Sequence, residues 1–481
     1  MVLTPARLIN MLSKESLLEL YSSLFKPRGV AVIGATPKEG KIGRIVVENL
    51  VKAEFKGKIY PVNPKYSEIL GLRAYSSVLE VPDPLDVVIV AVPAPIVPKV
   101  IEECGKRGVR IAIVLSAGFS EAGRKDLELE LLNRARKYDV RIIGPNCAGV
   151  VVPSIGFHAS FEELMSPGNI AVIGQSGAYI TALAAELERR GLGVSAFISY
   201  GNRVDLDEEL LLRLLLIHEE TKVIIYYVEG LRIGMGRRIL NTLKEVTMEK
   251  PVVIHKAGVM EAGARAVASH TGSLAGTYRL YEAAFKQAGA FIVNDIDLML
   301  DAAHVLLLPI NIDLTTSIPV IVTNSGGHGV VIADHLEMLG IRVPELPSDI
   351  RYKLKEHLPP HASLSNPIDM LAEATAETYT KVTKLLLSDK RIGVIIVVVN
   401  PPPFINACEI CREVVREWDY SGRIKPIVFY LAGFNIEEAI QYLRKTKIPV
   451  TSTHRGIACM VKALYDRCSY LKRCRSRKIK S

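Results

Sequence analysis

Cysteine and aromatic residues are scarce in this chain. Seven cysteines in 481 residues are too few and too scattered for a disulfide framework, so we expect a reducing compartment and a cytoplasmic location. Aromatic side chains make up 6% of the residues, and they are not interleaved with basic residues as in proteins that stack on nucleic-acid bases. The composition therefore predicts neither a disulfide-rich secreted protein nor a nucleic-acid partner.

Long apolar runs are also missing. The most continuous run, residues 394–399, is far shorter than the roughly 20 residues of a membrane-spanning helix, and Asn400 and three prolines follow it. The first 20 residues mix charged with apolar side chains and lack the core of a signal peptide. We therefore expect residues 394–399 to form a buried strand, and we expect no association with a membrane.

Two local clusters receive no functional role. Cys408 and Cys411 form a Cys-x-x-Cys, but neither a thioredoxin-like context nor a second pair of zinc ligands accompanies them. We expect one turn of an ordinary helix there and predict no metal site. The net charge is +9, and six of the last ten residues are Lys or Arg. This basic tail is expected to be a solvated, frayed terminus.

The pattern of apolar residues predicts an α/β protein with parallel sheets. Short β-branched runs alternate with longer amphipathic stretches, which is typical of βαβ units. We predict domains at residues 1–150, 151–305 and 317–481, with a linker over 305–316. The expected strands are 30–33, 58–62, 87–92, 111–115 and 141–143 in the first block, 170–173, 195–199, 222–228, 251–255 and 291–293 in the second, and 319–322, 341–343, 394–399, 426–430 and 449–451 in the third.

A glycine turn follows the first expected strand. Residues 34–43 would place backbone amides and a helix N-terminus against a phosphate. The turn is not a P-loop, because Gly34 and Gly40 are one residue too far apart and Ile42 replaces the Ser or Thr that holds magnesium. After the second strand, Lys65 stands where an NAD site would offer an acidic side chain. A cation there suits a phosphorylated ribose, as in coenzyme A (CoA) or NADP.

The second block contains a candidate phosphate site and a candidate nucleophile. Gln175, Ser176 and Gly177 follow a strand and open a helix, whose positive end favours a phosphate; an ordinary turn that needs glycine is the alternative. His270 stands among small residues upstream of a helix-like run, 277–285, and we expect a mobile loop from which the imidazole can attack phosphorus. A capping or core histidine is the alternative reading.

These residues carry a resemblance to a known family. Ser-His-Thr-Gly-Ser-Leu-Ala-Gly, residues 269–276, preceded by Lys256-Ala257-Gly258, is similar to the phosphohistidine segment of the ADP-forming (NDP-forming) acyl-CoA synthetases, relatives of succinyl-CoA synthetase. Residues 24–36, 116–121, 144–147, 175–178, 325–327 and 366–369 also stand in the family's order. The resemblance implies a Rossmann-type CoA-binding domain followed by two flavodoxin-like, succinyl-CoA synthetase-like domains.

The resemblance also implies roles for single residues. His270 would take a phosphoryl group, and Glu229, a carboxylate at the end of an apolar run, would hydrogen-bond and orient its ring. Phosphate or phosphohistidine would contact Gln175, Ser176, Gly177 and Asn146, although Asn146 is equally well explained as a turn former. CoA would contact Gly34, Thr36, Lys38, Lys41, Gly43, Lys65, Val92, Pro93, Ala94, Ser116, Ala117 and Gly118, whereas solvated lysines and a turn-shaping proline are the alternatives.

Two further segments match the family pattern only in part. Gly201, Asn202 and Asp205 match a family segment near the active centre, but Arg203 between them is unexpected. His328 stands where Pro or Ala is more usual, so we assign it no catalytic role.

The reaction implied by the resemblance is acyl-CoA, phosphate and ADP to and from acid, CoA and ATP, through an acyl phosphate and a phosphohistidine. The sequence contains neither an ATP-grasp region nor a Walker loop, so we expect the alpha subunit of an alpha2beta2 enzyme. Its ATP-grasp beta subunit would bind most of the ADP or ATP and Mg²⁺. A regulatory protein that binds CoA or NADP, a protein acyltransferase and an NADP oxidoreductase are the alternatives. The acyl group, whether acetate, branched-chain or aryl, is left open.

Overall fold

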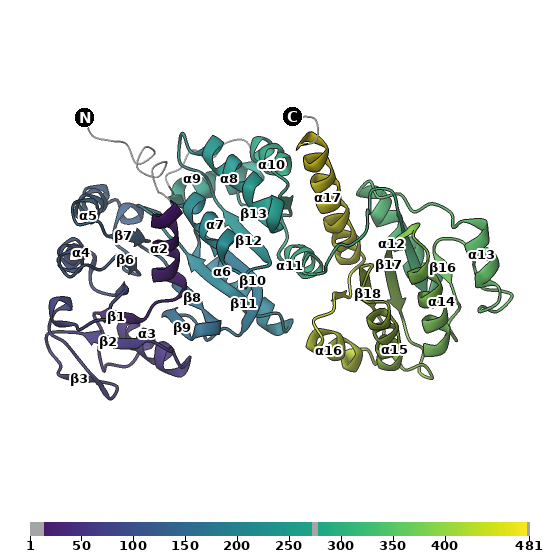
Figure 1. Ribbon diagram of the computed structural model, residues 1–481, viewed down its shortest axis with the longest axis horizontal. Helices are drawn as coiled ribbons and strands as arrows, with labels where there is room; N and C mark the ends of the chain where they lie inside the picture. Colours follow the sequence, from purple (N-terminus) through teal and green to yellow (C-terminus); the bar gives the residue numbers. More distant parts are fainter. Residues whose placement is uncertain (1–13, 272–277, 479–481) are drawn as a thin grey trace. The chain divides into compact units, whose positions relative to one another are not determined.

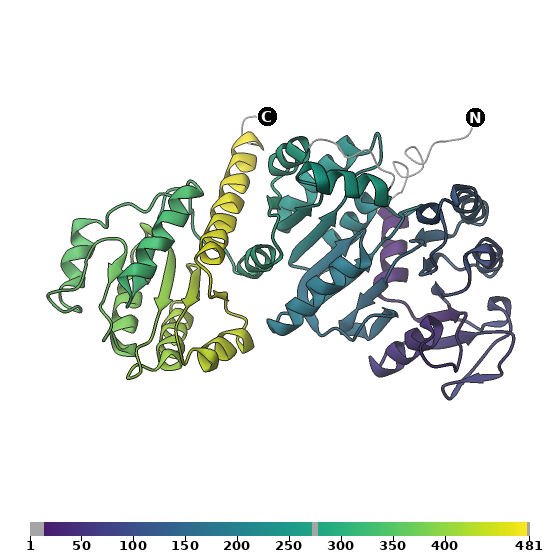
Figure 2. The same cartoon turned by 180° about the vertical axis from the view of Figure 1, so that it is seen from behind.

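The computed structural model describes residues 14–271 and 278–478. The chain divides into two compact units, Met1–Ile292 and Val293–Ser481. In both units the strands lie between layers of helices (Figure 1, Figure 2). This is the α/β architecture that the sequence predicts. The finer division at residues 1–150, 151–305 and 317–481 stays a prediction. None of the helices in the described ranges is both long and apolar enough to cross a membrane.

The first sheet of unit 1 has five parallel strands in the order β2-β1-β5-β6-β7. The strands are β1 (Gly29–Ile33), β2 (Lys58–Val62), β5 (Val87–Val90), β6 (Ile111–Val114) and β7 (Arg141–Ile143), and the helices around them are α2 (Lys14–Phe25), α3 (Ile42–Lys52), α4 (Val97–Lys106) and α5 (Lys125–Lys137). The chain order reverses between β1 and β5. Open α/β sheets bind their ligands at the carboxyl ends of the strands at such a reversal.

The second sheet of unit 1 has seven strands in the order β14-β13-β12-β10-β11-β8-β9. They are β8 (Gly149–Val152), β9 (Phe157–Ser160), β10 (Pro167–Gly174), β11 (Val194–Ser199), β12 (Val223–Val228), β13 (Val252–Lys256) and β14 (Phe291–Ile292). The helices are α6 (Gly177–Arg189), α7 (Glu208–Ile217), α8 (Gly236–Glu249), α9 (Glu261–Thr271) and α10 (Tyr278–Gln287). The strands from β14 to β11 are parallel, whereas β8 and β9 add an antiparallel hairpin that the sequence analysis missed.

Polar contacts join the two sheets of unit 1. Arg141 at the start of β7 donates two hydrogen bonds to Asp205, at 2.8 and 3.0 Å. Asn49 in α3 donates to the carbonyl oxygens of Ser160 and Glu162, at 2.9 and 2.8 Å. The two sheets are thereby held in one body, so residues from both sheets can form one site.

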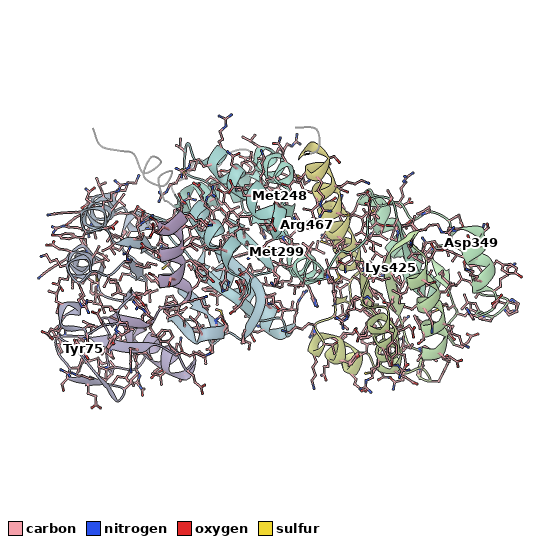
Figure 3. All side chains as sticks on the ribbon, in the orientation of Figure 1. Tyr75, Met248, Met299, Asp349, Lys425 and Arg467 are labelled. Atoms are coloured by element: carbon pink, nitrogen blue, oxygen red, sulfur yellow. The ribbon has the colours of Figure 1, made fainter. Side chains whose placement is uncertain are left out.

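Unit 2 contains a parallel sheet in the order β16-β15-β17-β18-β19. Its elements are α11 (Ile296–Val305), β15 (Ile318–Thr323), α12 (Gly326–Met338), α13 (Ser348–Leu354), β16 (Ile368–Asp369), α14 (Ala376–Ser388), β17 (Ile392–Val399), α15 (Ala407–Tyr420), β18 (Ile427–Leu431), α16 (Glu437–Lys445), β19 (Val450–Thr451) and α17 (His454–Lys478). Lys425 (Figure 3), just before β18, is buried and donates to the carbonyl oxygens of Leu386 and Asp389, at 2.8 and 2.5 Å.

Three expectations for unit 2 are settled by these elements. Cys408 and Cys411 are buried on α15 and form no disulfide bond, as predicted for one turn of an ordinary helix. Residues 341–343 form no strand in the described structure, because prolines at 344 and 347 interrupt any ladder of hydrogen bonds there. The basic tail is helical to Lys478 rather than frayed, and Lys472 on it pairs with Asp313 at 2.8 Å.

Candidate functional site

The glycine turn after β1 lies at the reversal of the first sheet. Gly34 has φ +92°, and a Cβ there would lie 2.5 Å from the carbonyl oxygen of Ala91. A Cβ on Gly43, in the first turn of α3, would overlap the carbonyl oxygen of Gly34. Only glycine therefore lets α3 start this close to the strand. The turn leaves Thr36 partly exposed and Lys38 and Lys41 exposed at the edge of the sheet.

The other residues expected to contact CoA lie at the same edge. Asn63 donates to the carbonyl oxygen of Ala35 at 2.7 Å, which ties the loop carrying the exposed Lys65 to the glycine turn. Ser116 donates to the carbonyl oxygen of Val92 at 2.6 Å, which joins the loops after β5 and β6. A Cβ on Gly118 would approach the Cβ of Ala94 at 3.2 Å, and Pro93 and Ala117 are exposed beside them. The structure thus brings the predicted CoA residues together around the reversal.

The carboxyl edge of the second sheet contains the Gln175 turn. Gln175 follows β10, Ser176 is the N-cap residue of α6, and Gly177 is its first residue. A Cβ on Gly177 would lie 2.8 Å from the Cβ of Ala148, so the helix can start here only with glycine. The predicted strand-to-helix turn is confirmed, and its amides form the positive end of a helix.

The side chain of Gln175 has a more definite partner than the sequence analysis expected. It is buried, and its Oε1 accepts hydrogen bonds from the backbone N–H groups of Glu229 and Gly230, at 2.8 and 3.2 Å. Since β10 and β12 are neighbours in the sheet, this amide fixes the end of β12 against the Gln175 turn. Gln175 therefore holds the backbone that carries the Glu229 carboxylate.

Glu229 is a buried carboxylate directly after β12, with 5% of its surface exposed. The hydroxyl of Tyr227 lies 3.5 Å from its Oε1, at the limit of a hydrogen bond. Burial raises the pKa of Tyr227, so this phenol stays protonated and donates. Tyr227 stacks on Tyr179 with a centroid distance of 4.1 Å, and the Tyr179 hydroxyl lies 2.6 Å from Nδ1 of His255. Aromatic rings thus form one wall beside the carboxylate.

Lys256 at the end of β13 is a buried cation for which the sequence predicts no role. It is 1% exposed, and its Nζ donates to the carbonyl oxygens of Glu229 and Ala257, at 2.8 and 2.5 Å. Nζ also lies 4.7 Å from the ring centroid of Tyr281, a distance that suits a cation–π contact. Burial lowers the pKa of Lys256 to about 8, although the nearby Glu229 carboxylate acts in the opposite direction. In the sequence, its signal was a lysine two residues after the β-branched run 252–254.

His270 lies in α9, which continues to Thr271 (Figure 1). The expected loop at His270 is therefore wrong, because Glu261 to Ala268 is rich in alanine, the best helix former, and extends the helix through the histidine. The His270 side chain and residues 272–277 lie outside the described part. The backbone places His270 on the helix that follows β13. In β13, Lys256 pairs in register with Val228 of β12, the neighbour of Glu229.

The junction between the two sheets contains Asn146 and Asn202. Asn146 follows β7 with φ +57°, as a turn former does, and its backbone N–H donates to the carbonyl oxygen of Ser116 at 2.9 Å. Its side-chain amide donates to Asn202 at 3.3 Å. Asn202 in turn donates to Glu121 at 2.5 Å. Burial raises the pKa of Glu121, but hydrogen bonds from Asn202 and from the N–H groups of Gly118 and neighbouring residues outweigh it and lower the pKa. Sequence reasoning did not find Glu121, although it lies in a quoted motif.

Arg203, the unexpected residue, has a structural explanation. It is buried with φ +51°, and its guanidinium pairs with the buried Glu208 at 3.1 Å and donates to the carbonyl oxygen of Gly230. The charge is therefore engaged within the protein, beside the backbone that follows Glu229. In the described residues no three His, Cys, Asp or Glu side chains are grouped closely enough to hold a metal ion.

Three family models match the chain. They are a CoA binding domain over residues 28–153, a succinyl-CoA ligase like flavodoxin domain over 167–306 and a ligase-CoA domain over 319–469.

Curated relatives and a solved structure point to the same family. The chain is 39% identical to the acetate–CoA ligase (ADP-forming) II subunit alpha of Pyrococcus furiosus, over 92% of this chain and 96% of that subunit. It is also 39% identical to the acetate–CoA ligase (ADP-forming) I of Archaeoglobus fulgidus, over 89% of this chain but only 60% of that longer protein.

The acetyl-CoA synthetase 1 of Ca. Korarchaeum cryptofilum, solved with phosphate and ADP, superposes with a TM-score of 0.90. It is 35% identical, and the match covers 94% of this chain and 98% of that one. The chain therefore belongs to the family of ADP-forming acetate–CoA ligase alpha subunits, whose domains are like those of succinyl-CoA ligase.

Proposed function

We propose that this chain is the alpha subunit of an ADP-forming acyl-CoA synthetase that interconverts acyl-CoA, phosphate and ADP with the free acid, CoA and ATP. The observation that carries the proposal is the buried Glu229, held by Gln175 and Lys256 at the sheet edge from which α9 and His270 follow. A buried carboxylate with fixed backbone partners next to a histidine-bearing helix suits the orientation of an imidazole nucleophile.

CoA binds at the reversal between β1 and β5. The amides of the Gly34 turn and the start of α3 face its phosphates, as expected for a glycine turn that opens a helix. Exposed Lys38, Lys41 and Lys65 supply positive charge to the phosphorylated end of the molecule. The loops 92–94 and 116–118 line the path of the pantetheine arm toward Asn146 and the second sheet.

The reaction runs through three transfers. A phosphate oxygen attacks the thioester carbonyl, the carbon–sulfur bond breaks, and the thiolate takes a proton to leave as CoA. The unprotonated ring nitrogen of His270 then attacks the phosphorus of the acyl phosphate, and the acid leaves as its carboxylate. Finally an oxygen of ADP takes the phosphoryl group from the histidine. Positioning and electrostatic stabilisation provide most of the catalysis in such transfers.

Each residue at the edge of the second sheet has a distinct role in these steps. The amides of Ser176 and Gly177 at the N-terminus of α6 stabilise the phosphoryl oxygens. Glu229 accepts a hydrogen bond from the imidazole, which fixes the nitrogen that attacks. Asn146 donates to the acyl carbonyl or a phosphate oxygen at the junction of the two sheets.

The nucleotide and Mg²⁺ are bound mainly by a separate beta subunit with an ATP-grasp domain, in an alpha2beta2 complex located in the cytoplasm. The relative from Pyrococcus furiosus is itself named a subunit alpha, and the relative from Archaeoglobus fulgidus is a longer chain, of which this chain spans 60%. The solved relative contains ADP and phosphate, which supports these two substrates for the complete enzyme.

The proposal is tested by assembling the chain with its ATP-grasp partner and measuring ATP formation from acetyl-CoA, phosphate and ADP. We expect ATP with the wild-type chain, none with His270→Asn, and unchanged CoA binding in that variant by calorimetry. If CoA or NADPH binds but no acyl-CoA supports ATP formation, the chain is a regulatory protein. Tight binding of NADPH in place of CoA would instead favour an oxidoreductase.

A further inference from the structure

Three polar side-chain atoms converge at the carboxyl edge of the sheet in unit 2. They are Nδ1 of His328 in the first turn of α12, the hydroxyl of Tyr430 on β18 and Nε2 of His454, the first residue of α17. The two ring nitrogens are 2.9 Å apart, and the hydroxyl lies 3.2 Å from His328 and 3.1 Å from His454. Three separate elements, all labelled in Figure 1, thus place three donor atoms at the corners of a small triangle.

Hydrogen bonds alone do not satisfy this triangle. A ring nitrogen of imidazole has one site in the plane of the ring, which either carries a proton or accepts one. The three close contacts would need two bonds at each corner, and neither imidazole nitrogen can make two well-directed bonds. Two hydrogen bonds through the Tyr430 hydroxyl would use each ring nitrogen once, so the 2.9 Å contact between the two ring nitrogens is left without a proton.

The edges of the triangle match a metal coordination sphere. Zinc binds imidazole nitrogen at about 2.0–2.1 Å, so neighbouring ligand atoms are about 2.9 Å apart at right angles and about 3.4 Å apart at a tetrahedral angle. The observed edges of 2.9, 3.1 and 3.2 Å fall between these two values. The spacing of the three atoms therefore suits one ion, and the two imidazole rings, whose centroids are 5.1 Å apart, turn to direct both nitrogens at it.

We propose that His328, Tyr430 and His454 bind a divalent transition-metal ion of the kind that prefers imidazole, such as Zn²⁺. Two of the three ligands are imidazole nitrogens, and the third is the phenolic oxygen of Tyr430. Both imidazoles are half-buried whereas Tyr430 is 2% exposed, so the ion is reached from the solvent side and water completes its coordination.

The proposed ion lies where α/β sheets commonly bind their ligands, at the carboxyl ends of parallel strands. It adds positive charge beside the N-terminus of α12. Residues 325–327 at this N-terminus match a family motif, but the resemblance gives His328 no role. The proposal stands on unit 2 alone and does not depend on the reaction proposed for unit 1.

A titration of the full chain after treatment with EDTA tests the site. We expect one Co²⁺ per chain with a visible absorption band typical of imidazole ligands, and competition of that ion by Zn²⁺ in calorimetry. His328→Ala and His454→Ala should each weaken binding at least about tenfold, since even the loss of indirect ligand partners costs that much. Tyr430→Phe should weaken binding less than either histidine variant.

His335→Ala is the matched control. His335 lies on the same helix, and its ring centroid is 6.3 Å from that of His454, outside the triangle. This variant and His270→Ala should bind the ion as the wild type does. Circular dichroism confirms that each variant is folded, and His328→Gln replaces any alanine variant that is not. Absence of a stoichiometric ion, or an ion retained when both His328 and His454 are replaced, overturns the proposal.

Discussion

Glu229 and Lys256 are the two described residues on which the proposed chemistry depends most. Both side chains are buried, and Nζ of Lys256 donates a hydrogen bond to the backbone carbonyl oxygen of Glu229. Sequence reasoning pointed to Glu229 because a carboxylate rarely ends an apolar strand without a reason. It could not show that Gln175 and Lys256 hold the backbone of Glu229, since that depends on the order of the strands in the sheet.

Glu229→Gln should lower the rate of His270 phosphorylation by at least about 100-fold, because a neutral amide neither fixes the ring tautomer nor stabilises a charged imidazole. CoA affinity should not change, since the proposed CoA site lies at the other sheet. The rate of labelling of His270 and a calorimetric titration with CoA measure the two effects. Tyr227→Phe is the control and should change little, because its contact with Glu229 is 3.5 Å long. Equal losses in both variants would contradict the role of the carboxylate.

Lys256→Met should slow the labelling of His270 about tenfold, because the end of β12 loses the donor that fixes Glu229. Lys425→Met is a matched control: Lys425 (Figure 3) is also buried and donates to two carbonyl oxygens, but it lies in unit 2. Both variants should lose about 1–3 kcal/mol of stability, since each leaves buried carbonyl groups unpaired. Loss of labelling in both variants would mean that Lys256 acts only through general stability.

The lowered pKa values of two buried lysines predict how the free energy of unfolding depends on pH. Burial lowers the pKa of Lys256 and of Lys425 to about 8, below the usual 10.5. Between pH 8 and 10.5 the unfolded chain binds more protons than the folded chain, so the free energy of unfolding should rise with pH in this window. Urea unfolding at several pH values should show this rise, and Lys256→Met and Lys425→Met should each make it smaller. A rise that is unchanged in both variants would contradict the assignment.

Among the elements, the central strands could be predicted closely because their residues are β-branched and buried on both faces. The central strand β1 begins one residue earlier than the expected strand 30–33, and β12 begins one residue later than the expected strand 222–228. The edge strand β2 has the expected bounds, 58–62. The hairpin β8–β9 was missed, because only a short turn, Pro153–Ile155, separates its strands, whereas an α/β pattern predicts a helix between neighbouring strands. The helix at His270 was missed because small residues were interpreted as a loop, whereas alanine favours a helix. Contacts between distant elements, such as His328 with His454, leave no signal in the spacing of residues.

Gly43→Ala tests the close approach of α3 to the glycine turn. The new Cβ would overlap the carbonyl oxygen of Gly34, so the helix must move, at a cost of about 1–3 kcal/mol. We expect a lower Tm and a CoA affinity reduced about tenfold, measured by calorimetry. Gly236→Ala is the control, because no described atom lies within 4 Å of a Cβ at this first residue of α8. Unchanged CoA binding in Gly43→Ala would contradict the placement of CoA at this turn.

At the scale of the whole molecule, all residues proposed for CoA binding and phosphoryl transfer lie in unit 1. They come from the carboxyl edges of two sheets that Arg141, Asp205 and Asn49 hold together. The family resemblance could be recognised from the sequence because its motifs are short, local and in a fixed order. The partner proposed to bind the nucleotide could not be described in the same way, because a resemblance carried by this chain gives no residues of another chain.

The most direct measurement is the mapping of phosphorylated peptides, without acid, after the chain alone is mixed with acetyl-CoA and labelled phosphate. The account predicts label on His270, its absence in His270→Ala, and release of CoA in step with labelling. If no label is found with the chain alone, the same measurement is made with the ATP-grasp subunit present. Label on another residue, or no label on His270 even in the complete complex, would contradict the central claim that this histidine carries the phosphoryl group.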